Sequence, residues 1–256
     1  MAGRDDATAV PEEGAAVAAV FGEHVDPARR FVEHLATTGV SRGLLGPREV
    51  PRLWERHVLN CAVVEQLIPT RARVVDVGSG AGLPGIAVAI LRPDLRMELL
   101  EPLLRRVEWL QSVVDDLGLD HVRETRGRAE EYAGKLGADT VVARAVAPLA
   151  VLAGWCLPLL RPGGELIAVK GRTVTEEVTE AEPVLRRLGA VRWEILRVGE
   201  GVLDEPTTVV RVVAGTPGQR PRTGAGQGSG QGPGRGVESA PRDEGTRSRG
   251  RRPRAH

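Results

Sequence analysis

The chain has 256 residues, and 35 Lys plus Arg against 34 Asp plus Glu give it a net charge of +1. The charge is unevenly placed, because nine Arg and three acids give residues Gly215–His256 a net charge of +6 and leave −5 for Met1–Ala214. Eleven Gly and five Pro also lie in 215–256, with few apolar residues to bury. This composition predicts a disordered tail over 215–256, and we expect 1–14 to be a flexible N-terminus.

Cysteine usage and the apolar runs exclude several classes of protein. Cys61 and Cys156 have no further Cys or His at metal-ligand spacing, so we expect neither a metal site nor a disulfide framework. The N-terminus is acidic where a signal peptide needs a basic and then an apolar run. The longest apolar stretch, 145–160, is too short and too interrupted by proline to span a bilayer. We therefore expect a cytoplasmic protein without membrane contact.

Residues 15–70 have the spacing of amphipathic helices. Apolar residues recur every three or four positions, as at Leu53, Val58, Cys61 and Val64, and His57 falls on the same stripe. Asp26 followed by Pro27 is a good cap and first-turn pair for a helix. This pattern predicts an N-terminal helical extension.

Residues 71–214 predict an α/β domain. Short aliphatic runs alternate with helical stretches from Arg71 to Leu188, which indicates βαβ units and a parallel sheet covered on both faces. The last two runs, VRWEILRVG and PTTVVRVVA, follow each other without a helix. They predict an antiparallel hairpin that closes the sheet.

A glycine-rich segment, VVDVGSGAGLPG, lies at the first strand-to-helix turn of this domain. Glycines let the backbone approach a ligand closely, and the following helix presents free N–H groups. Gly80, Gly82 and Gly85 spell G-x-G-x-x-G, and Glu101 ends the next strand, which is the pattern of dinucleotide-binding proteins.

The register of the loop favours a different nucleotide cofactor. In a dinucleotide fold the first glycine follows the strand directly, and here that residue is Gly78, whose third partner position is Leu83. The alternative is D-x-G-x-G-x-G starting at Asp76, the pattern of class I S-adenosylmethionine-dependent methyltransferases. An acid beside the ligand attracts an ammonium and a sulfonium but repels a pyrophosphate. Glu101 suits either class, because both need an acceptor for ribose hydroxyls.

Several sequence blocks together resemble one methyltransferase family. They are LWERHVL (53–59), VVDVGSGAGLPGIAVAILRPD (74–94), RVEWL (106–110), RAEEY (128–132), ARAVAPL (143–149) and AVKG (168–171). In this order they resemble the GidB/RsmG family, which methylates guanine N7 in 16S ribosomal RNA. The resemblance implies a Rossmann-like class I fold with a mostly parallel seven-stranded sheet, and S-adenosyl-L-methionine as the cofactor.

The resemblance also implies which residues contact the cofactor. The family's contacts fall on Gly78, Leu83, Ala129, Glu130 and Arg144, beside the loop residues Asp76, Gly80, Gly82 and Glu101 named above. Helix packing is the alternative for Leu83, and complementation of a helix dipole is the alternative for Glu130. Arg144 interrupts a nearly continuous apolar segment, and arginine is rarely buried without a partner, so a functional role is expected there.

Three further polar residues are candidates for RNA contact. Arg56 and His57 lie on a helix that packs against the domain, and a core histidine with satisfied hydrogen bonds is the alternative for His57. Lys170 ends the fifth strand, where ligands bind at the carboxyl edge of such sheets. It is predicted to contact a phosphate or a base edge, and a salt bridge is the alternative.

The expected chemistry needs alignment more than a general base, because guanine N7 already carries a lone pair. Arg144 and Lys170 are expected to donate hydrogen bonds to O6 beside N7. The expected partner is 16S ribosomal RNA or the small ribosomal subunit, including an assembly intermediate, and the protein is expected to be a monomer. Two alternatives remain: an RNA-binding protein with a degenerate methyltransferase fold, and an NAD-dependent oxidoreductase.

Overall fold

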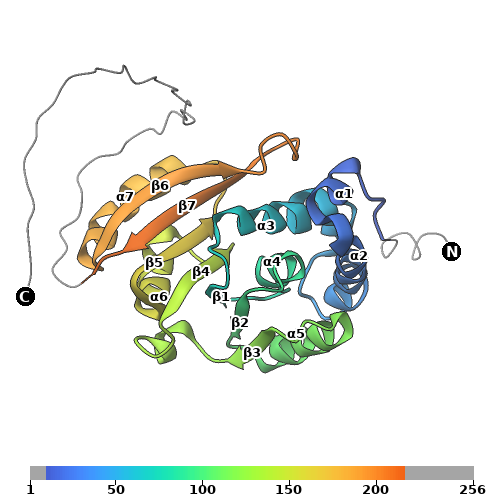
Figure 1. Cartoon of the computed structure of the whole chain (residues 1–256), viewed down its shortest axis with the longest axis horizontal. Coiled ribbons are helices and arrows are strands. Elements are labelled where there is room, and N and C mark those ends of the chain that lie inside the picture. The colour runs from blue at the N-terminus through green and yellow to red at the C-terminus, as the bar shows by residue number, and fades with distance from the viewer. Residues whose placement is uncertain (1–9, 217–256) are drawn as a thin grey trace, which may run out of the picture. The chain divides into compact units, whose positions relative to one another are not determined.

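A seven-stranded sheet forms the centre of the computed structural model, which describes residues 10–216 (Figure 1). Its strands, in the spatial order β3-β2-β1-β4-β5-β7-β6, are β3 (Val122–Arg126), β2 (Arg96–Glu101), β1 (Arg73–Val77), β4 (Ala138–Arg144), β5 (Leu160–Val169), β7 (Thr207–Ala214) and β6 (Ala190–Val198). β1 to β5 pair in parallel, and β7 runs antiparallel to both neighbours. The predicted parallel sheet and closing hairpin are confirmed. Of the tail predicted over 215–256, residues 217–256 lie outside the described range, as do the first nine residues of the predicted flexible N-terminus.

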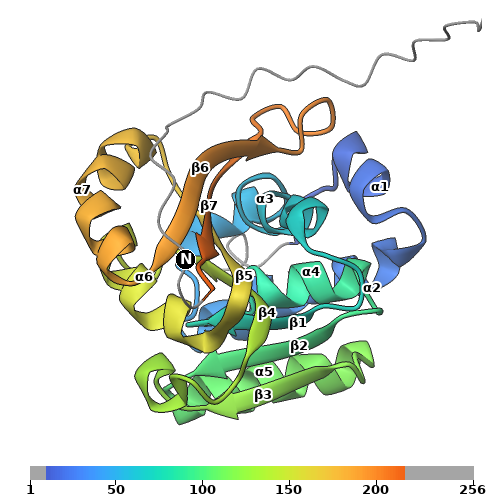
Figure 2. The same ribbon diagram turned by 60° about the vertical axis from the view of Figure 1, so that its left-hand side comes forward.

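Helices cover both faces of the sheet. They are α1 (Ala15–Phe21), α2 (Val25–His34), α3 (Leu59–Ala62), α4 (Gly85–Leu91), α5 (Leu104–Leu117), α6 (Leu149–Cys156) and α7 (Val174–Arg187). Figure 2 shows α6 and α7 on the side of β5 to β7 that faces away from α1 and α3. Short 3-10 and π segments join several of them, among them η2 (Leu35–Gly39), η3 (Pro47–Arg52), η4 (Leu53–Val58), η5 (Val63–Leu67) and η6 (Ala129–Tyr132).

The alternation of side chains along the strands divides the core into two clusters. Val74, Leu99 and Val142 pack with α4, α5 and the N-terminal helices, whereas Val75 and Leu100 pack with α6 and α7. Phe31 of α2 and Trp109 of α5 belong to the first cluster. The N-terminal helical extension therefore shares a hydrophobic core with the sheet and does not form a separate core.

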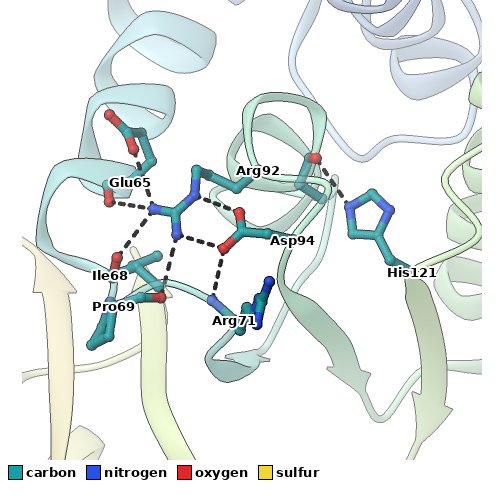
Figure 3. A network of polar contacts seen from close by, with 8 residues as sticks. Glu65, Ile68, Pro69, Arg71, Arg92, Asp94 and His121 are labelled. Carbon is teal, nitrogen blue, oxygen red and sulfur yellow. Dashed lines mark hydrogen bonds and ion pairs between the residues drawn. The ribbon is translucent and has the colours of Figure 1, made fainter.

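A polar network joins the end of this extension to the first βαβ unit (Figure 3). The guanidinium of Arg92 donates to both carboxylate oxygens of Asp94 and to the backbone oxygens of Glu65, Ile68 and Pro69. Asp94 Oδ2 also accepts the Arg71 N–H at 2.7 Å. Arg92 thus ties the segment after η5 to the loop before β2, although the Glu65 and Pro69 carbonyls also accept the Ile68 and Ala72 N–H groups.

The segment that carries LWERHVL differs from the regular helix that the spacing predicts. η3 precedes it, the π segment η4 covers Leu53–Val58, and only Leu59–Ala62 is α-helical before η5 begins. Pro51 inside η3 has no N–H to donate, which disfavours a continuous α-helix through 47–58. π segments are rare and often occur at functional sites.

The described residues contain neither a membrane-spanning helix nor a cluster of metal ligands. In residues 10–216, no helix is long and apolar enough to cross a membrane. The same part of the chain holds no group of three or more His, Cys, Asp and Glu side chains that could hold a metal ion.

Candidate cofactor and substrate site

The loop after β1 turns sharply at the carboxyl edge of the sheet. Gly78, Gly80 and Gly82 have φ values of +70°, +55° and +77°, in the left-handed region that favours glycine. A Cβ on Gly78 would meet both Cγ atoms of Val146 at 3.1 Å, and one on Gly82 would meet Ile86 Cδ1 at 2.5 Å. The loop is therefore held in a conformation that side chains at these positions would disturb.

A cavity of about 570 Å³ opens beside this loop. It lies where the carboxyl ends of β1, β2, β3 and β4 meet, the usual ligand position in open α/β sheets. Its lining includes Gly78, Gly80, Leu83, Glu101, Ala129, Glu130 and Arg144 from the sheet edge, and Leu44, Leu45 and His57 from the N-terminal extension.

The structure thus brings most of the predicted site residues together, and it separates four of them. Asp76 is buried behind the loop and Gly82 is a buried part of the loop itself, and neither lines the cavity. Arg56 is exposed outside it. Lys170 lines a separate hollow beside α7.

Asp76 was expected beside the cofactor, and the structure corrects that expectation. Its side chain points to the same face of the sheet as Val74, toward α4, because side chains alternate along β1. Oδ2 accepts the Gly85 N–H at 3.0 Å, and Oδ1 has no hydrogen-bond partner among the described residues. Burial raises the pKa of this carboxyl to about 7. Asp76 therefore supports the loop and the first turn of α4 from behind.

Glu101 lies at the cavity wall as predicted, and it is only 1% exposed. Oε2 accepts the Gly80 N–H at 3.0 Å and Oε1 accepts the Leu103 N–H at 3.1 Å. Arg106 Nη1 lies 3.7 Å from Oε1. Each carboxylate oxygen keeps a lone pair, so Glu101 can still accept a hydroxyl hydrogen from a ligand.

Arg144 is held by the N-terminal extension. Nη1 donates to the His57 carbonyl at 3.3 Å and to Cys61 Sγ at 3.1 Å, and Nη2 donates to the Arg56 carbonyl at 3.1 Å and to His57 Nδ1 at 2.8 Å. These contacts use all four terminal N–H groups and leave Nε–H. The expected use of the terminal guanidinium on guanine O6 is therefore not supported, because those donors have protein partners.

His57 has the satisfied hydrogen bonds of a core histidine, and its contact with RNA stays a prediction. It is buried and satisfied, and it also lines the cavity. Burial and the neighbouring Arg144 lower its pKa, although Glu49 at 2.7 Å from Nε2 opposes them. The imidazole is therefore neutral at pH 7.

Lys170 forms the salt bridge that was the alternative to ligand contact. Nζ donates to Glu177 Oε1 at 2.6 Å and to the Ala147 carbonyl at 2.9 Å, and only 9% of the side chain is exposed. Glu176 and Glu180 line the same hollow. Lys170 therefore fastens the 145–148 loop to α7. These two bonds leave one Nζ–H, and its contact with a phosphate or base edge stays a prediction.

Several residues at the cavity were not anticipated. Leu44, Leu45 and Trp155 line the cavity although the sequence pattern gave them no role in the site. Arg128 also lines the cavity, one residue before Ala129. The position of Arg128 in the RAEEY block could have indicated a role at the site. No sequence pattern indicated the two leucines, because their loop reaches the cavity only through tertiary folding.

The cavity fits an S-adenosyl-L-methionine molecule in size and in chemistry. Its volume lies within the range of about 300–1,000 Å³ that ligand pockets span. The Glu101 carboxylate offers an acceptor for ribose hydroxyls, and Gly78 and Gly80 line the cavity without side chains that would fill it.

Solved structures share the fold at low sequence identity. An S-adenosylmethionine-dependent O-methyltransferase from Thermotoga maritima matches 73% of this chain and 71% of its own, with a TM-score of 0.50 and 15% identity. A predicted O-methyltransferase from Agrobacterium tumefaciens matches 61% of this chain and 81% of its own, with a TM-score of 0.51 and 16% identity. The predicted class I methyltransferase fold is confirmed.

Sequence relatives are far more similar. A protein of Pseudarthrobacter chlorophenolicus named ribosomal RNA small subunit methyltransferase G is 59% identical over 198 residues, covering 77% of this chain and 92% of that protein. A Streptomyces avermitilis protein of the same name is 58% identical over 201 residues, covering 78% and 84%. The GidB family model, described as rRNA small subunit methyltransferase G, matches residues 25–203. The chain therefore belongs to the GidB family of rRNA small subunit methyltransferases, which confirms the predicted family, enzyme class and S-adenosyl-L-methionine cofactor and excludes the dehydrogenase alternative.

Proposed function

We propose that this protein transfers the methyl group of S-adenosyl-L-methionine to N7 of a specific guanine in 16S ribosomal RNA. The observation that carries the choice of N7 is the state of His57, the cavity residue best suited to act as a base. Both of its ring nitrogens are engaged, with Arg144 and Glu49. N7 of guanine has an available lone pair, so methylation there needs no residue to remove a proton.

The cofactor is proposed to lie along the carboxyl edge of the sheet. Glu101 accepts its ribose hydroxyls, and Gly78, Gly80 and Leu83 bound its methionine part. Ala129 and Glu130 face the adenine, one through its backbone and the other through its side chain. When bound, the cofactor supplies an electrophilic methyl group on a sulfonium.

The protein contributes alignment of the base with that methyl group. Arg144 positions the η4 segment against the end of β4, so that His57 forms a fixed wall of the cavity. A fixed wall restricts the orientations of the bound base. Correct orientation is a large part of catalysis for a reaction that needs no proton transfer. The free Nε–H of Arg144 is the donor that remains for the substrate.

We infer that the enzyme acts on the small subunit or an assembly intermediate, in the cytoplasm and as a monomer. A partner role for 16S ribosomal RNA is supported by the names of the relatives above.

Methylation of ribosomal particles tests the proposal. Small subunits and naked 16S RNA from a strain lacking the gene are incubated with the purified protein and methyl-labelled cofactor, and 7-methylguanosine is located by cleavage at the modified base. One labelled guanine is expected. Label at another atom, or in another RNA, would overturn the assignment.

Calorimetry separates this function from that of an RNA-binding protein with a degenerate fold. Wild type is expected to bind S-adenosylmethionine tightly and NAD weakly. Glu101→Ala is expected to lose most of the cofactor affinity. Glu130→Ala makes the same substitution at an exposed position and is expected to lower that affinity less. A wild-type protein that binds RNA but no S-adenosylmethionine would favour the degenerate alternative.

A further inference from the structure

Residues 42–56 concentrate positive charge on a protein body that is otherwise acidic. Arg42, Arg48, Arg52 and Arg56 are all exposed, and the only acids in this stretch are Glu49 and Glu55. The stretch therefore carries +2, whereas residues 1–214 together carry −5. We call these four arginines the arginine edge.

The charge of the arginine edge is largely uncompensated. Among the described residues, no acidic side chain lies within ion-pair distance of Arg42, Arg48 or Arg52, and Arg56 reaches only Glu49, at 3.9 Å. The carboxylate of Glu49 is already bound by His57 at 2.7 Å. By contrast, Arg29 and Arg30 of α2 pair with Glu13, Asp26 and Asp116.

The same stretch of chain borders the cavity. Leu44 and Leu45, two and three residues after Arg42, line it, and so does His57, directly after Arg56. η3, which carries Arg48 and Arg52, connects these two cavity-lining positions. The stretch that carries the arginine edge thus contributes Leu44 and Leu45 to the cavity wall and leads directly to His57, while its four arginines are exposed to solvent.

A polymeric substrate must continue past such a cavity on both sides of the reacting base. An enzyme that acts on a nucleobase takes that base out of the stack, and the flanking backbone then crosses the rim of its pocket. Guanidinium groups suit this rim because they bind phosphate oxygens in pairs, whatever the base sequence.

We propose that the arginine edge binds the phosphate backbone of the RNA strand next to the target guanine. This inference rests on the proposed function, and it assigns to Arg42, Arg48 and Arg52 a role in substrate binding. The residues supply affinity and register, while the cavity selects the base. They take no part in cofactor binding.

The test is the salt dependence of RNA binding by the full-length protein. Each arginine that neutralises a phosphate contributes about 0.7 to 0.9 to the slope of log affinity against log salt. The variant Arg42→Gln/Arg48→Gln/Arg52→Gln is therefore expected to lower that slope by about 2 to 3. Its apparent KM for small subunits should rise at least tenfold, with the dissociation constant for S-adenosylmethionine and the kcat at saturating subunits within about twofold of wild type.

Two matched variants separate position from charge. Arg96→Gln/Arg123→Gln/Arg187→Gln removes the same charge from exposed positions at the starts of β2 and β3 and at the end of α7, and it should leave the slope unchanged. Arg42→Lys/Arg48→Lys/Arg52→Lys should keep most of the slope. Circular dichroism melting shows that each variant folds.

The outcomes distinguish this inference from the proposed function. Equal slopes for wild type and the edge variant, or equal losses in the edge and control variants, would overturn the arginine edge and leave methylation at N7 unaffected. If wild type methylates another atom, the proposed function fails. The binding slopes, measured directly on RNA, still decide whether the edge contacts phosphate.

Discussion

Arg144 Nη2 lies 2.8 Å from His57 Nδ1, and this contact fixes the state of the imidazole. A guanidinium has only donors, so Nδ1 must be the unprotonated nitrogen. The hydrogen is then on Nε2, which donates to Glu49 Oε2 at 2.7 Å. A chain of three side chains from η3, η4 and β4 therefore joins the N-terminal extension to the end of the central sheet.

The first prediction concerns the titration of His57. Burial and Arg144 lower its pKa below 6.5, so it is expected to stay neutral with its hydrogen on Nε2 at pH 7 and to gain a proton only in more acidic solution. Between that lowered pKa and 6.5 the unfolded chain binds the extra proton, so this residue's contribution to stability falls as the pH falls.

Nitrogen NMR of the imidazoles checks both the tautomer and the titration. His57→Gln identifies the resonance, and His121, whose Nε2 lies 3.1 Å from the Ala89 carbonyl, serves as an internal comparison. Arg144→Gln should raise the pKa of His57, because it removes a cation. A hydrogen on Nδ1 at pH 7 would contradict the contact with Arg144.

The second prediction makes Glu49 a positioning residue that acts through His57. Glu49→Ala removes the acceptor of the Nε2 hydrogen, so Arg144 alone then holds the imidazole in place. Loss of one charge-assisted hydrogen bond, about 1.4 kcal/mol, should lower kcat/KM for small subunits about tenfold. Glu49→Gln keeps an acceptor oxygen and should retain most of the activity. If both variants had wild-type activity and an unchanged His57 tautomer, Glu49 would have no such role.

The third prediction uses the raised pKa of Asp76, about 7 in the fold. Unfolded Asp loses its proton near pH 4, so between pH 4 and 7 the folded protein binds the extra proton. Without cofactor, stability should therefore decrease as pH rises through this window, by up to about 1.4 kcal/mol per pH unit, and this contribution should level off above pH 7.

Asp76→Asn isolates this effect from the other titrating groups. The amide oxygen can still accept the Gly85 N–H, and the side chain no longer ionises. The difference in unfolding free energy between the variant and wild type, measured in urea, should grow in favour of the variant from pH 4 to 7. A constant difference across that range would mean that Asp76 is ionised in the fold.

The sequence predicted the order of elements because strand and helix periodicities are local. It also predicted the turn at Gly78 and the wall at Glu101, since the carboxyl ends of parallel strands meet at one edge. It did not predict which way Asp76 points: β1 is buried on both faces, so its apolar pattern does not say which face receives each residue.

Contacts between segments far apart in the sequence explain the other differences between the expected and the observed site. Arg144 meets Arg56 and His57 across more than 80 residues of sequence, and no local pattern encodes that pairing. η4 leaves the Arg56 and His57 carbonyls available to Arg144, a feature of tertiary context that helical spacing did not indicate. Lys170 follows the end of β5 as predicted. Its partner, Glu177, lies on α7, and the packing of α7 on the sheet could not be read from the strand pattern.

The last prediction follows from that pair. Lys170→Met leaves Glu177 half-buried without its cation, and loss of a hydrogen bond between charged groups should cost about 2 kcal/mol of unfolding free energy. Glu177→Gln alone leaves the lysine unpaired and should cost a similar amount. The double variant Lys170→Met/Glu177→Gln should lose less unfolding free energy than the sum of the two single losses, because it leaves no unpaired charge. Urea unfolding of wild type, the two single variants and the double variant measures the coupling between Lys170 and Glu177.

RNA binding by Lys170→Met tests the alternative role of the lysine. The affinity for RNA and its dependence on salt should be unchanged, and a smaller salt slope would show that Lys170 contacts a phosphate.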